Sequence, residues 1–327
     1  MILAVIEQDG GRPDRSSLEA LTVARRLADG LGIPLAAVLF GPQAPTAAAA
    51  LGAFGVSTAH VVEHPDLAGY APVAWARSIG QLVESASPSI VLEAGTDRGQ
   101  EVLAYAAAMA GAPMAANCVE VRPGGPGAAF EVTRQRWGGS LLEEARLDGP
   151  VRFLTIAEHA NAPEEASSAA LVRVEAFTPA LSQADLRVRV VARVAPEVGK
   201  VSLADARVVV GGGRGVGGAE AFSELEELAG LLNGAVGVSR VVTSAGWRPH
   251  SQQVGQTGTR IAPDIYIACG ISGAIQHIVG CKAAKSILVI NTDPEAPIMS
   301  RAAYAVIGDL HAVVPAISAE IMRRRAS

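Results

Sequence analysis

The segment Ile265-Tyr-Ile-Ala-Cys-Gly-Ile-Ser-Gly-Ala-Ile-Gln-His277 predicts a β-strand, a tight turn and the beginning of a helix. Its first part, Ile265–Cys269, is an apolar run of the length expected for a buried strand. Ser272, Gly273 and Ala274 form the predicted turn, and their backbone N–H groups would face a phosphate at the start of the helix. A strand that leads into a helix in this way is the repeating unit of parallel α/β sheets.

Gln276 and His277 would lie on the first turns of that helix. A lone histidine is more often a surface residue or a hydrogen-bonded core residue than a ligand contact. Its position just inside a phosphate-type turn favours the ligand contact here, because parallel α/β sheets bind ligands at the carboxyl ends of their strands.

A second polar segment, Gln253-Val-Gly-Gln-Thr-Gly258, precedes the predicted strand Ile265–Cys269. Its glutamines and threonine supply hydrogen-bonding side chains, and its glycines permit a close approach of the backbone to a ligand. A flavin ring needs such partners at N5, O2 and O4. The alternative is a polar surface loop, which the absence of lysine and glutamate disfavours. We therefore predict a flavin dinucleotide at this segment.

The rest of the chain alternates strands and helices in two blocks. Ile2–Ile6 and Leu35–Phe40 are predicted strands, and a capping box from Ser16 to Glu19 would open the helix between them. From about residue 130 short strands follow without long helices, which predicts a strand pair added to the first sheet. Four more strands are predicted in the second block, at 207–210, 235–238, 286–290 and 304–307, with a helix opened by a second capping box from Ser223 to Glu226.

This pattern predicts an α/β protein with two domains, each a mainly parallel sheet flanked by helices. The N-terminal domain would span residues 1–195; the family resemblance given below implies that it is nucleotide-hydrolase-like and contacts another subunit. The C-terminal domain would span residues 196–327 and be a Rossmann-like FAD-binding domain.

Gly213-Arg-Gly-Val-Gly-Gly218 matches a dinucleotide fingerprint between a predicted strand and a predicted helix. A nicotinamide site expects an acidic residue about twenty positions later, where this chain has Ser239-Arg240. The NAD interpretation is weakened, whereas Arg240 could accept the extra phosphate of NADP. A glycine turn without a ligand is the other alternative. Asn291–Pro297 and Gly308–Leu310 also follow predicted strands and could contribute to the same edge.

Composition narrows the class of protein. The net charge is −5 and no basic stripe is interleaved with aromatic residues, so nucleic acid is not an expected partner. Cys118, Cys269 and Cys281 stand in apolar surroundings, which predicts buried free thiols in a reducing, cytoplasmic compartment. No apolar run reaches the roughly 20 residues of a membrane span. No metal-binding or nucleophile motif is present, so neither a metal nor a catalytic residue is predicted.

The motifs of the C-terminal half closely resemble the electron transfer flavoprotein α subunit, or FixB, family. The match extends over nearly all of residues 205–318, and its motifs occur in order with family-like spacing. The segments that carry it are Gly212–Gly215, Ser239-Arg240, Gln253–Gly258, Tyr266–His277, Asn291–Ile298 and Gly308–Leu310.

The resemblance implies that the C-terminal domain holds most of one FAD. Thr257 would hydrogen-bond near flavin N5, His277 near O2, and Arg240 would lie close to the ring. Ser272 and its neighbours would hold the pyrophosphate, whereas Asn291 and Asp309 would serve the adenosine side. The implied cofactor-binding residues are Arg214, Ser239, Arg240, Gln253, Val254, Gly255, Gln256, Thr257, Ser272, Gly273, Ala274, Ile275, Gln276, His277, Asn291, Asp309 and Leu310.

The resemblance also implies an electron carrier without substrate turnover of its own. It would pair with a homologous β subunit that completes the flavin site and carries AMP. Electrons would come from flavin dehydrogenases, such as the acyl-CoA dehydrogenases of fatty acid β-oxidation, and leave to a quinone reductase at the membrane. Thr292, Ala303 and Ser244 depart from the family pattern, which commonly has lysine, aspartate and an acid there. The alternatives are an NADP-dependent oxidoreductase and an α/β module that binds AMP or ATP.

Overall fold

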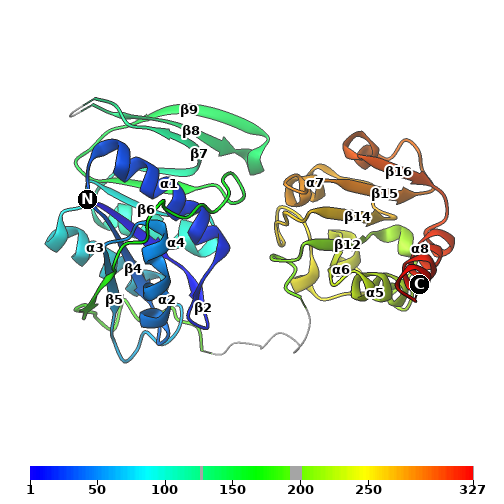
Figure 1. Cartoon of the computed structure of the whole chain (residues 1–327), viewed down its shortest axis with the longest axis horizontal. Coiled ribbons are helices and arrows are strands. Elements are labelled where there is room, and N and C mark those ends of the chain that lie inside the picture. The colour runs from blue at the N-terminus through cyan, green and yellow to red at the C-terminus, as the bar shows by residue number, and fades with distance from the viewer. Residues whose placement is uncertain (126–127, 192–200, 327) are drawn as a thin grey trace. The chain divides into compact units, whose positions relative to one another are not determined.

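The computed structural model describes residues 1–125, 128–191 and 201–326. They form two compact units, Met1–Val194 and Ala195–Ser327, each with a central sheet and helices on both sheet faces (Figure 1). This confirms the α/β class with large, mainly parallel sheets. The domain boundary expected at residues 195 and 196 lies outside the described residues.

The N-terminal unit is built on a nine-stranded sheet. All pairs are parallel except those that β8 makes with β7 and β9, so the predicted added strand pair is present. The first strands are apolar and fully buried because helices cover both of their faces. In sheet order the strands are β11 (Arg173–Phe177), β5 (Thr58–Val62), β4 (Leu35–Phe40), β1 (Ile2–Ile6), β6 (Ile90–Ala94), β10 (Arg152–Ile156), β7 (Met114–Arg122), β8 (Phe130–Arg136) and β9 (Leu141–Leu147).

Two pairs of helices cover this sheet. One buried cluster joins α1 and α2 to one face, and another joins α3 and α4 to the other. The helices are α1 (Arg15–Leu31), α2 (Ala44–Ala50), α3 (Pro72–Ala86) and α4 (Asp97–Met109), and a small hairpin of β2 (Gln8–Asp9) and β3 (Arg12–Pro13) precedes α1.

The capping box predicted for α1 is wrong. The N-cap residue is Asp14, and it makes no side-chain capping bond. The Ser16 hydroxyl instead donates to Glu158 at 3.3 Å, while a Glu19 oxygen accepts from the backbone N–H of His159 at 2.8 Å. Both side chains therefore bind a distant segment of the chain, and Glu19 also pairs with Arg15 in the first turn of α1, but neither caps a backbone N–H at the helix end.

Strand β6 carries a fully buried carboxyl group, Glu93. Neither of its oxygens has a hydrogen-bond partner among the described residues, and Gly99 of α4 lies directly against it. Burial, reinforced by the nearby Glu7, raises the pKa of Glu93 well above its usual range. This carboxyl group is therefore held in its neutral form.

The C-terminal unit is built on a five-stranded, fully parallel sheet. The strand order reverses direction between β12 and β14, which makes their carboxyl ends the topological switch point where such sheets bind ligands. In sheet order the strands are β13 (Ala235–Val238), β12 (Val208–Gly212), β14 (Ile265–Cys269), β15 (Ile287–Asn291) and β16 (Tyr304–Ile307).

The two faces of this sheet are covered differently. Helices α5, α6 and α8 pack on one face, whereas α7 and the short 3-10 helix η5 pack on the other. The helices are α5 (Phe222–Leu231), α6 (Arg240–Ser244), α7 (Ile275–Cys281), α8 (Leu310–Ala326) and η5 (Pro297–Arg301). The second capping box is also wrong, because the N-cap of α5 is Ala221 without a side-chain bond and the Ser223 hydroxyl donates to the Glu220 carbonyl.

Two glycines of β12 make room for aromatic rings on opposite faces of the sheet. A Cβ at Gly211 would lie 2.6 Å from Cζ of Tyr266, and one at Gly212 would lie 2.9 Å from Cζ of Phe222. Both distances are far below van der Waals contact, so these positions accept no side chain while the rings stay in place.

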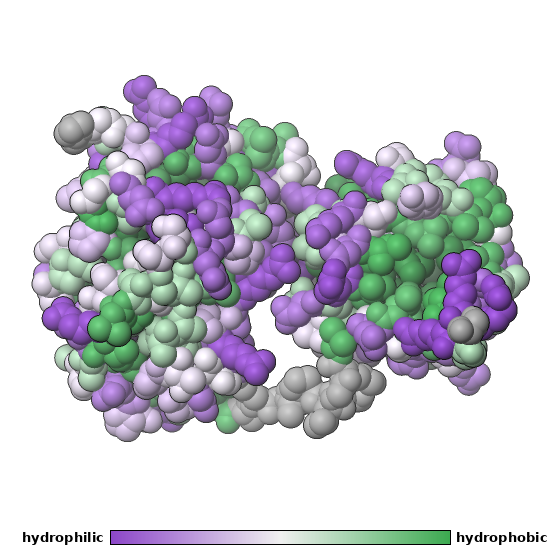
Figure 2. All heavy atoms as spheres, viewed as in Figure 1, coloured by the Kyte–Doolittle hydropathy of each residue, from purple (hydrophilic) through white to green (hydrophobic). Residues whose placement is uncertain are grey.

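Strand β16 ends the sheet among the described residues, and all four of its residues are exposed. Tyr304 is 69% exposed and Ile307 is 54% exposed. Figure 2 shows a broad apolar area on this unit. An exposed apolar strand at a sheet edge is unusual in a protein that stays alone, because it presents unpaired backbone groups to other chains.

Candidate FAD-binding site

A cavity of about 620 Å³ opens at the carboxyl ends of the C-terminal strands. The segments after β12, β13, β14 and β15 all contribute to its wall, together with residues 253–257. This volume lies within the range of cofactor pockets. The loops at one sheet edge that the sequence predicts therefore meet around one space.

The glycine run after β12 contributes close packing at the switch point. The N–H groups of Gly213 and Gly215 donate to the carbonyls of Cys269 and Gly270, at 2.9 and 3.0 Å. A Cβ at Gly213 would lie 2.7 Å from Cα of Ile271. The run lies between β12 and α5, as the sequence predicts, but α5 begins only at Phe222, so three residues separate Gly218 from the helix.

The loop 253–258 is held in shape by the buried side chain of Gln253. Its Oε1 accepts from the Thr243 hydroxyl at 2.7 Å, which shares its one proton with the Arg240 carbonyl at 2.9 Å, and its Nε2 donates to the Thr257 hydroxyl at 3.0 Å. Thr257 Oγ1 thus acts as an acceptor toward Gln253, which leaves its O–H free to donate toward the cavity. Gln253 itself is 2% exposed and acts as a support for the loop.

The same loop lies directly on helix α7. The Gln256 N–H donates to the carbonyl of Gln276 at 2.8 Å, and a Cβ on Gly280 would overlap the backbone of Gly255. Gly255 has φ +150, a conformation that only glycine adopts without strain. Glycine at both positions is what lets the loop and the helix form one continuous wall.

The turn between β14 and α7 presents backbone donors to the cavity. The N–H groups of Ser272, Gly273 and Ala274 have no acceptor among the residues that the structure describes. Gly273 has φ +84, and a Cβ there would lie 2.5 Å from the backbone nitrogen of Ile298. Successive free N–H groups in such a turn form an anion-binding concavity, as phosphate groups require.

Two arginines border the cavity, Arg214 in the 3-10 helix η3 (Arg214–Val216) and Arg240 at the first position of α6. Both side chains are exposed. Within residues 201–326 neither guanidinium is recorded in an ion pair, so both charges are available to an anionic ligand. Ser239, the residue before Arg240, also lines the cavity.

His277 lines the cavity from α7 but is only 6% exposed. Its Nε2 lies 2.8 Å from the hydroxyl of Tyr266, and its Nδ1 is buried without a hydrogen-bond partner among the described residues. Burial lowers the pKa of His277 to about 4, an effect that the backbone of Val254 partly opposes. The imidazole is therefore neutral at pH 7.

Three of the predicted site residues lie outside the wall of this cavity. Ile275 is 73% exposed, and Leu310, the first residue of α8, is buried in the core. Asp309 accepts from the N–H of His311 at 3.0 Å and from two further N–H groups through its carbonyl, so it caps α8. The other predicted residues all line the cavity, including Asn291, whose Nδ2 donates to the carbonyl of Ile271 at 3.0 Å.

Several lining residues were not in the predicted set. Gly270, Ile271 and Asp293 stand inside quoted motifs, so the signal for them was present in the sequence. Ser244 lies one helical turn after Arg240, and this i,i+4 spacing could have placed it on the same side. The full list of additional lining residues is Gly215, Val241, Ser244, Gly270, Ile271, Asp293 and Ala296.

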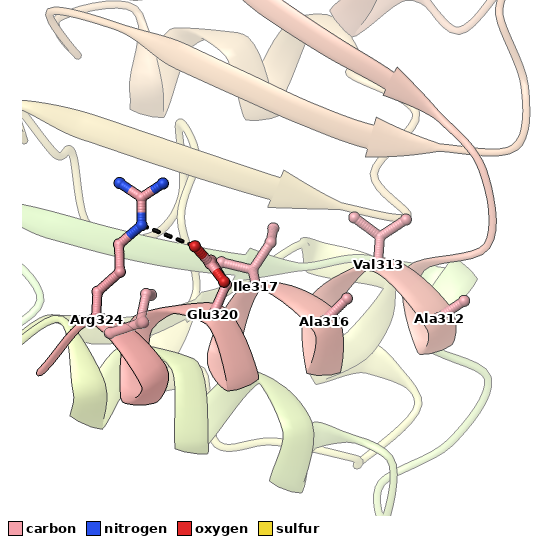
Figure 3. A pocket seen from close by; sticks show the side chains of 7 residues that line it. Ala312, Val313, Ala316, Ile317, Glu320 and Arg324 are labelled. Carbon is pink, nitrogen blue, oxygen red and sulfur yellow. Dashed lines mark hydrogen bonds and ion pairs between the residues drawn. The ribbon is translucent and has the colours of Figure 1, made fainter. Parts of the chain in front are cut away.

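A second hollow of this unit, of about 570 Å³, runs along helix α8 and has a different character. Figure 3 shows apolar side chains from Val313 to Ile317 along it, with the Glu320–Arg324 ion pair at one end. Glu320 pairs there with both Arg323 and Arg324, and every lining residue belongs to α8. It lacks the groups that phosphates and a flavin ring need.

Two protein-family models match this chain. A model described as "Electron transfer flavoprotein FAD-binding domain" matches residues 202–282, and one described as "Electron transfer flavoprotein domain" matches residues 2–182. The chain belongs to the electron transfer flavoprotein α-subunit family. Its C-terminal unit is the FAD-binding domain, and FAD is its cofactor.

Curated relatives match this chain over almost its whole length. It is 33% identical to the electron transfer flavoprotein subunit alpha of Thermoanaerobacterium thermosaccharolyticum, over 97% of this chain and 96% of the relative. It is 37% identical to the protein of that name from Mycobacterium tuberculosis, with 99% of each covered, and 34% identical to the protein FixB of Clostridium saccharobutylicum, with 96% and 94% covered.

The residues of the cavity fit FAD chemically. Free N–H groups at 272–274 suit a pyrophosphate, two arginines suit an anionic ligand, and the orphaned Nδ1 of His277 suits a ring carbonyl. FAD supplies the acceptance and release of electrons. The electron transfer flavoprotein chain supplies the shape, the hydrogen bonds and the positive charge around it.

Proposed function

We propose that this chain is the α subunit of a heterodimer and carries electrons on an FAD held in the 620 Å³ cavity. The observation that supports the placement is the convergence of free backbone donors, free arginines and an unpartnered histidine nitrogen on one space. The β subunit would complete the flavin site and carry AMP, as the resemblance implies.

We assign the cofactor contacts by chemical type. The Thr257 O–H, which Gln253 leaves free, would donate near flavin N5. His277 would donate near O2, and Arg240 would lie beside the ring. The turn at Ser272 would hold the pyrophosphate, with Asn291 on the adenosine side.

In this role the chain has no substrate of its own. Electrons would arrive from flavin dehydrogenases such as acyl-CoA dehydrogenases and leave to a quinone reductase at the membrane or to another acceptor. The exchange would take place in the cytoplasm, where the three buried thiols stay reduced. Residues 1–195 would provide subunit contacts and residues 196–327 the cofactor. No described helix is long and apolar enough to cross a membrane.

The test is an absorbance spectrum of the chain co-expressed with its β subunit. We expect a flavin spectrum, and FAD released on denaturation. Thr257→Val should keep FAD but lower its midpoint potential. Thr259→Val, a matched change two residues later and outside the cavity wall, should leave the potential unchanged. A colourless heterodimer that stays colourless in excess FAD, or that binds NADP or AMP in place of it, would contradict the proposal.

A further inference from the structure

Tyr266 lies beneath the cavity and contacts His277, and no role is assigned to it above. It belongs to β14, is completely buried, and lies across Gly211 of the neighbouring strand β12. The bare position at Gly211 is what allows the ring to lie there. Its hydroxyl reaches α7 and comes within 2.8 Å of His277 Nε2.

The position of the protons decides which group donates in the hydrogen bond between Tyr266 and His277. Burial raises the pKa of Tyr266 well above its usual range, so the hydroxyl keeps its proton. Among the described residues, His277 Nε2 is the hydroxyl's recorded hydrogen-bond partner. If Nε2 carried a proton and donated to Tyr266, the Tyr266 proton would be buried without an acceptor, at a cost of about 1–3 kcal/mol. Tyr266 therefore donates and Nε2 accepts.

This direction decides where the proton of the imidazole lies. A neutral imidazole carries one proton, and an accepting Nε2 places it on Nδ1. Nδ1 is buried and has no hydrogen-bond partner within residues 201–326. The backbone of Val254 favours a protonated imidazole but makes no hydrogen bond of ordinary geometry with Nδ1. This N–H therefore has room for a stronger acceptor at the wall of the polar cavity.

We propose that Tyr266 is a positioning residue, which fixes His277 as the Nδ1–H tautomer and so reserves that N–H for a carbonyl oxygen of the flavin pyrimidine ring. The proposal rests on the placement of FAD in this cavity. It gives Tyr266 a function that its buried position alone does not require. A phenylalanine would fill the same space above Gly211 but would let the imidazole proton move between the two nitrogens.

The direct test is the ¹⁵N spectrum of histidine side chains in the full chain, without FAD. The chain has six histidines, and loss of one signal set in His277→Gln assigns His277. We expect a single Nδ1–H tautomer in the wild type and in Tyr304→Phe, the matched loss of a hydroxyl from an exposed tyrosine of the same unit. Tyr266→Phe should show both tautomers. An Nε2–H tautomer in the wild type, or an unchanged tautomer in Tyr266→Phe, would overturn the proposal.

FAD titration supplies the second readout. Loss of one ordered neutral hydrogen bond should weaken FAD binding by roughly 2- to 12-fold in Tyr266→Phe and not in Tyr304→Phe. His277→Asn, whose amide nitrogen takes the place of Nδ1, should bind FAD more tightly than His277→Gln. Equal FAD affinity in Tyr266→Phe and the wild type would overturn the role of Tyr266. If FAD binds without moving the His277 signals, the placement of FAD is wrong while the tautomer result still stands.

Discussion

Arg240 gives the sharpest test of how the chain sets the midpoint potential of its cofactor. It borders the cavity from the first position of α6, and within residues 201–326 its guanidinium is recorded in no ion pair. Arg240→Gln removes one positive charge and keeps most of the side-chain length. Since an electron added to the ring is attracted by that charge, the substitution should lower the midpoint potential.

The magnitude follows from Coulomb's law. Two unit charges about 4 Å apart attract each other by about 4 kcal/mol at an effective dielectric of about 20 and by about 1 kcal/mol in bulk water. At about 59 mV for each tenfold change in a one-electron equilibrium, this corresponds to roughly 170 mV and 40 mV. Arg240 is exposed, so the shift should lie nearer the smaller value and shrink further at high salt.

The assay is a spectroelectrochemical titration of the flavin in the heterodimer at low and at high ionic strength. Arg207→Gln is the matched control, because it removes the same charge at the opposite end of β12, where Arg207 pairs with Asp264. Equal potentials in Arg240→Gln and Arg207→Gln would refute the reasoning. Loss of FAD in Arg240→Gln alone would instead show that the charge acts on binding.

Three further predictions concern stability. Glu93→Gln should stabilise the N-terminal unit at pH 7.5 but not at pH 4, because only at the higher pH does the unfolded Glu93 lose its proton. The gain should be about 1.4 kcal/mol for each pH unit by which the folded pKa exceeds the ordinary value. Urea midpoints at both pH values measure it, and equal gains at both would contradict the prediction. Without FAD, the free energy of unfolding should fall by up to about 3 kcal/mol as the pH drops from 6.5 towards 4, because unfolded His277 takes up a proton that the folded state excludes. His277→Gln should lack this pH dependence. The same pH dependence in the wild type and in His277→Gln would exclude His277 as its cause. Gly211→Ala should cost at least about 1–3 kcal/mol by thermal unfolding, whereas Gly218→Ala, which meets open space, should not, and equal losses would argue against the clash with Tyr266.

Much of the sheet architecture could be predicted from the sequence because buried parallel strands are short apolar runs. Strands β1, β4, β13, β14 and β16 have the predicted bounds, since a polar or glycine residue follows each of them. Short apolar runs between such residues are typical of strands in an α/β fold, and this holds even for β16, which is exposed at the sheet edge. Local pattern and tertiary environment agree there.

The helix starts were predicted less well because capping is decided by competing partners. Ser16 and Glu19 match a capping box in sequence, but both side chains bond a segment about 140 residues away, and Glu19 also pairs with Arg15. Glu226 likewise forms an ion pair with Arg248 instead of returning to its helix end. Such long-range partners have no local signal.

The candidate site was predictable where the residues of one motif act together. Residues 253–257 form one continuous segment and residues 272–274 another, so recognising each motif identified all of its lining residues together. Asp309 was assigned to the cavity because it follows a strand, yet the same position is where a helix needs its cap. The contact between Tyr266 and His277 depends on a ring lying across a neighbouring strand, which no single-sequence pattern encodes.

The paired glycines of β12 couple the evolution of four positions, because each glycine faces one aromatic ring. Any lineage that replaces Gly211 by a larger residue must also shrink or move Tyr266, and Gly212 stands in the same relation to Phe222. Neither glycine can gain a side chain before its partner ring shrinks or moves, so substitutions at these pairs should occur together or not at all. Because Tyr266 also contacts His277 of the cavity wall, a substitution that repacks the Gly211–Tyr266 pair would also change the hydrogen bond available to the cofactor.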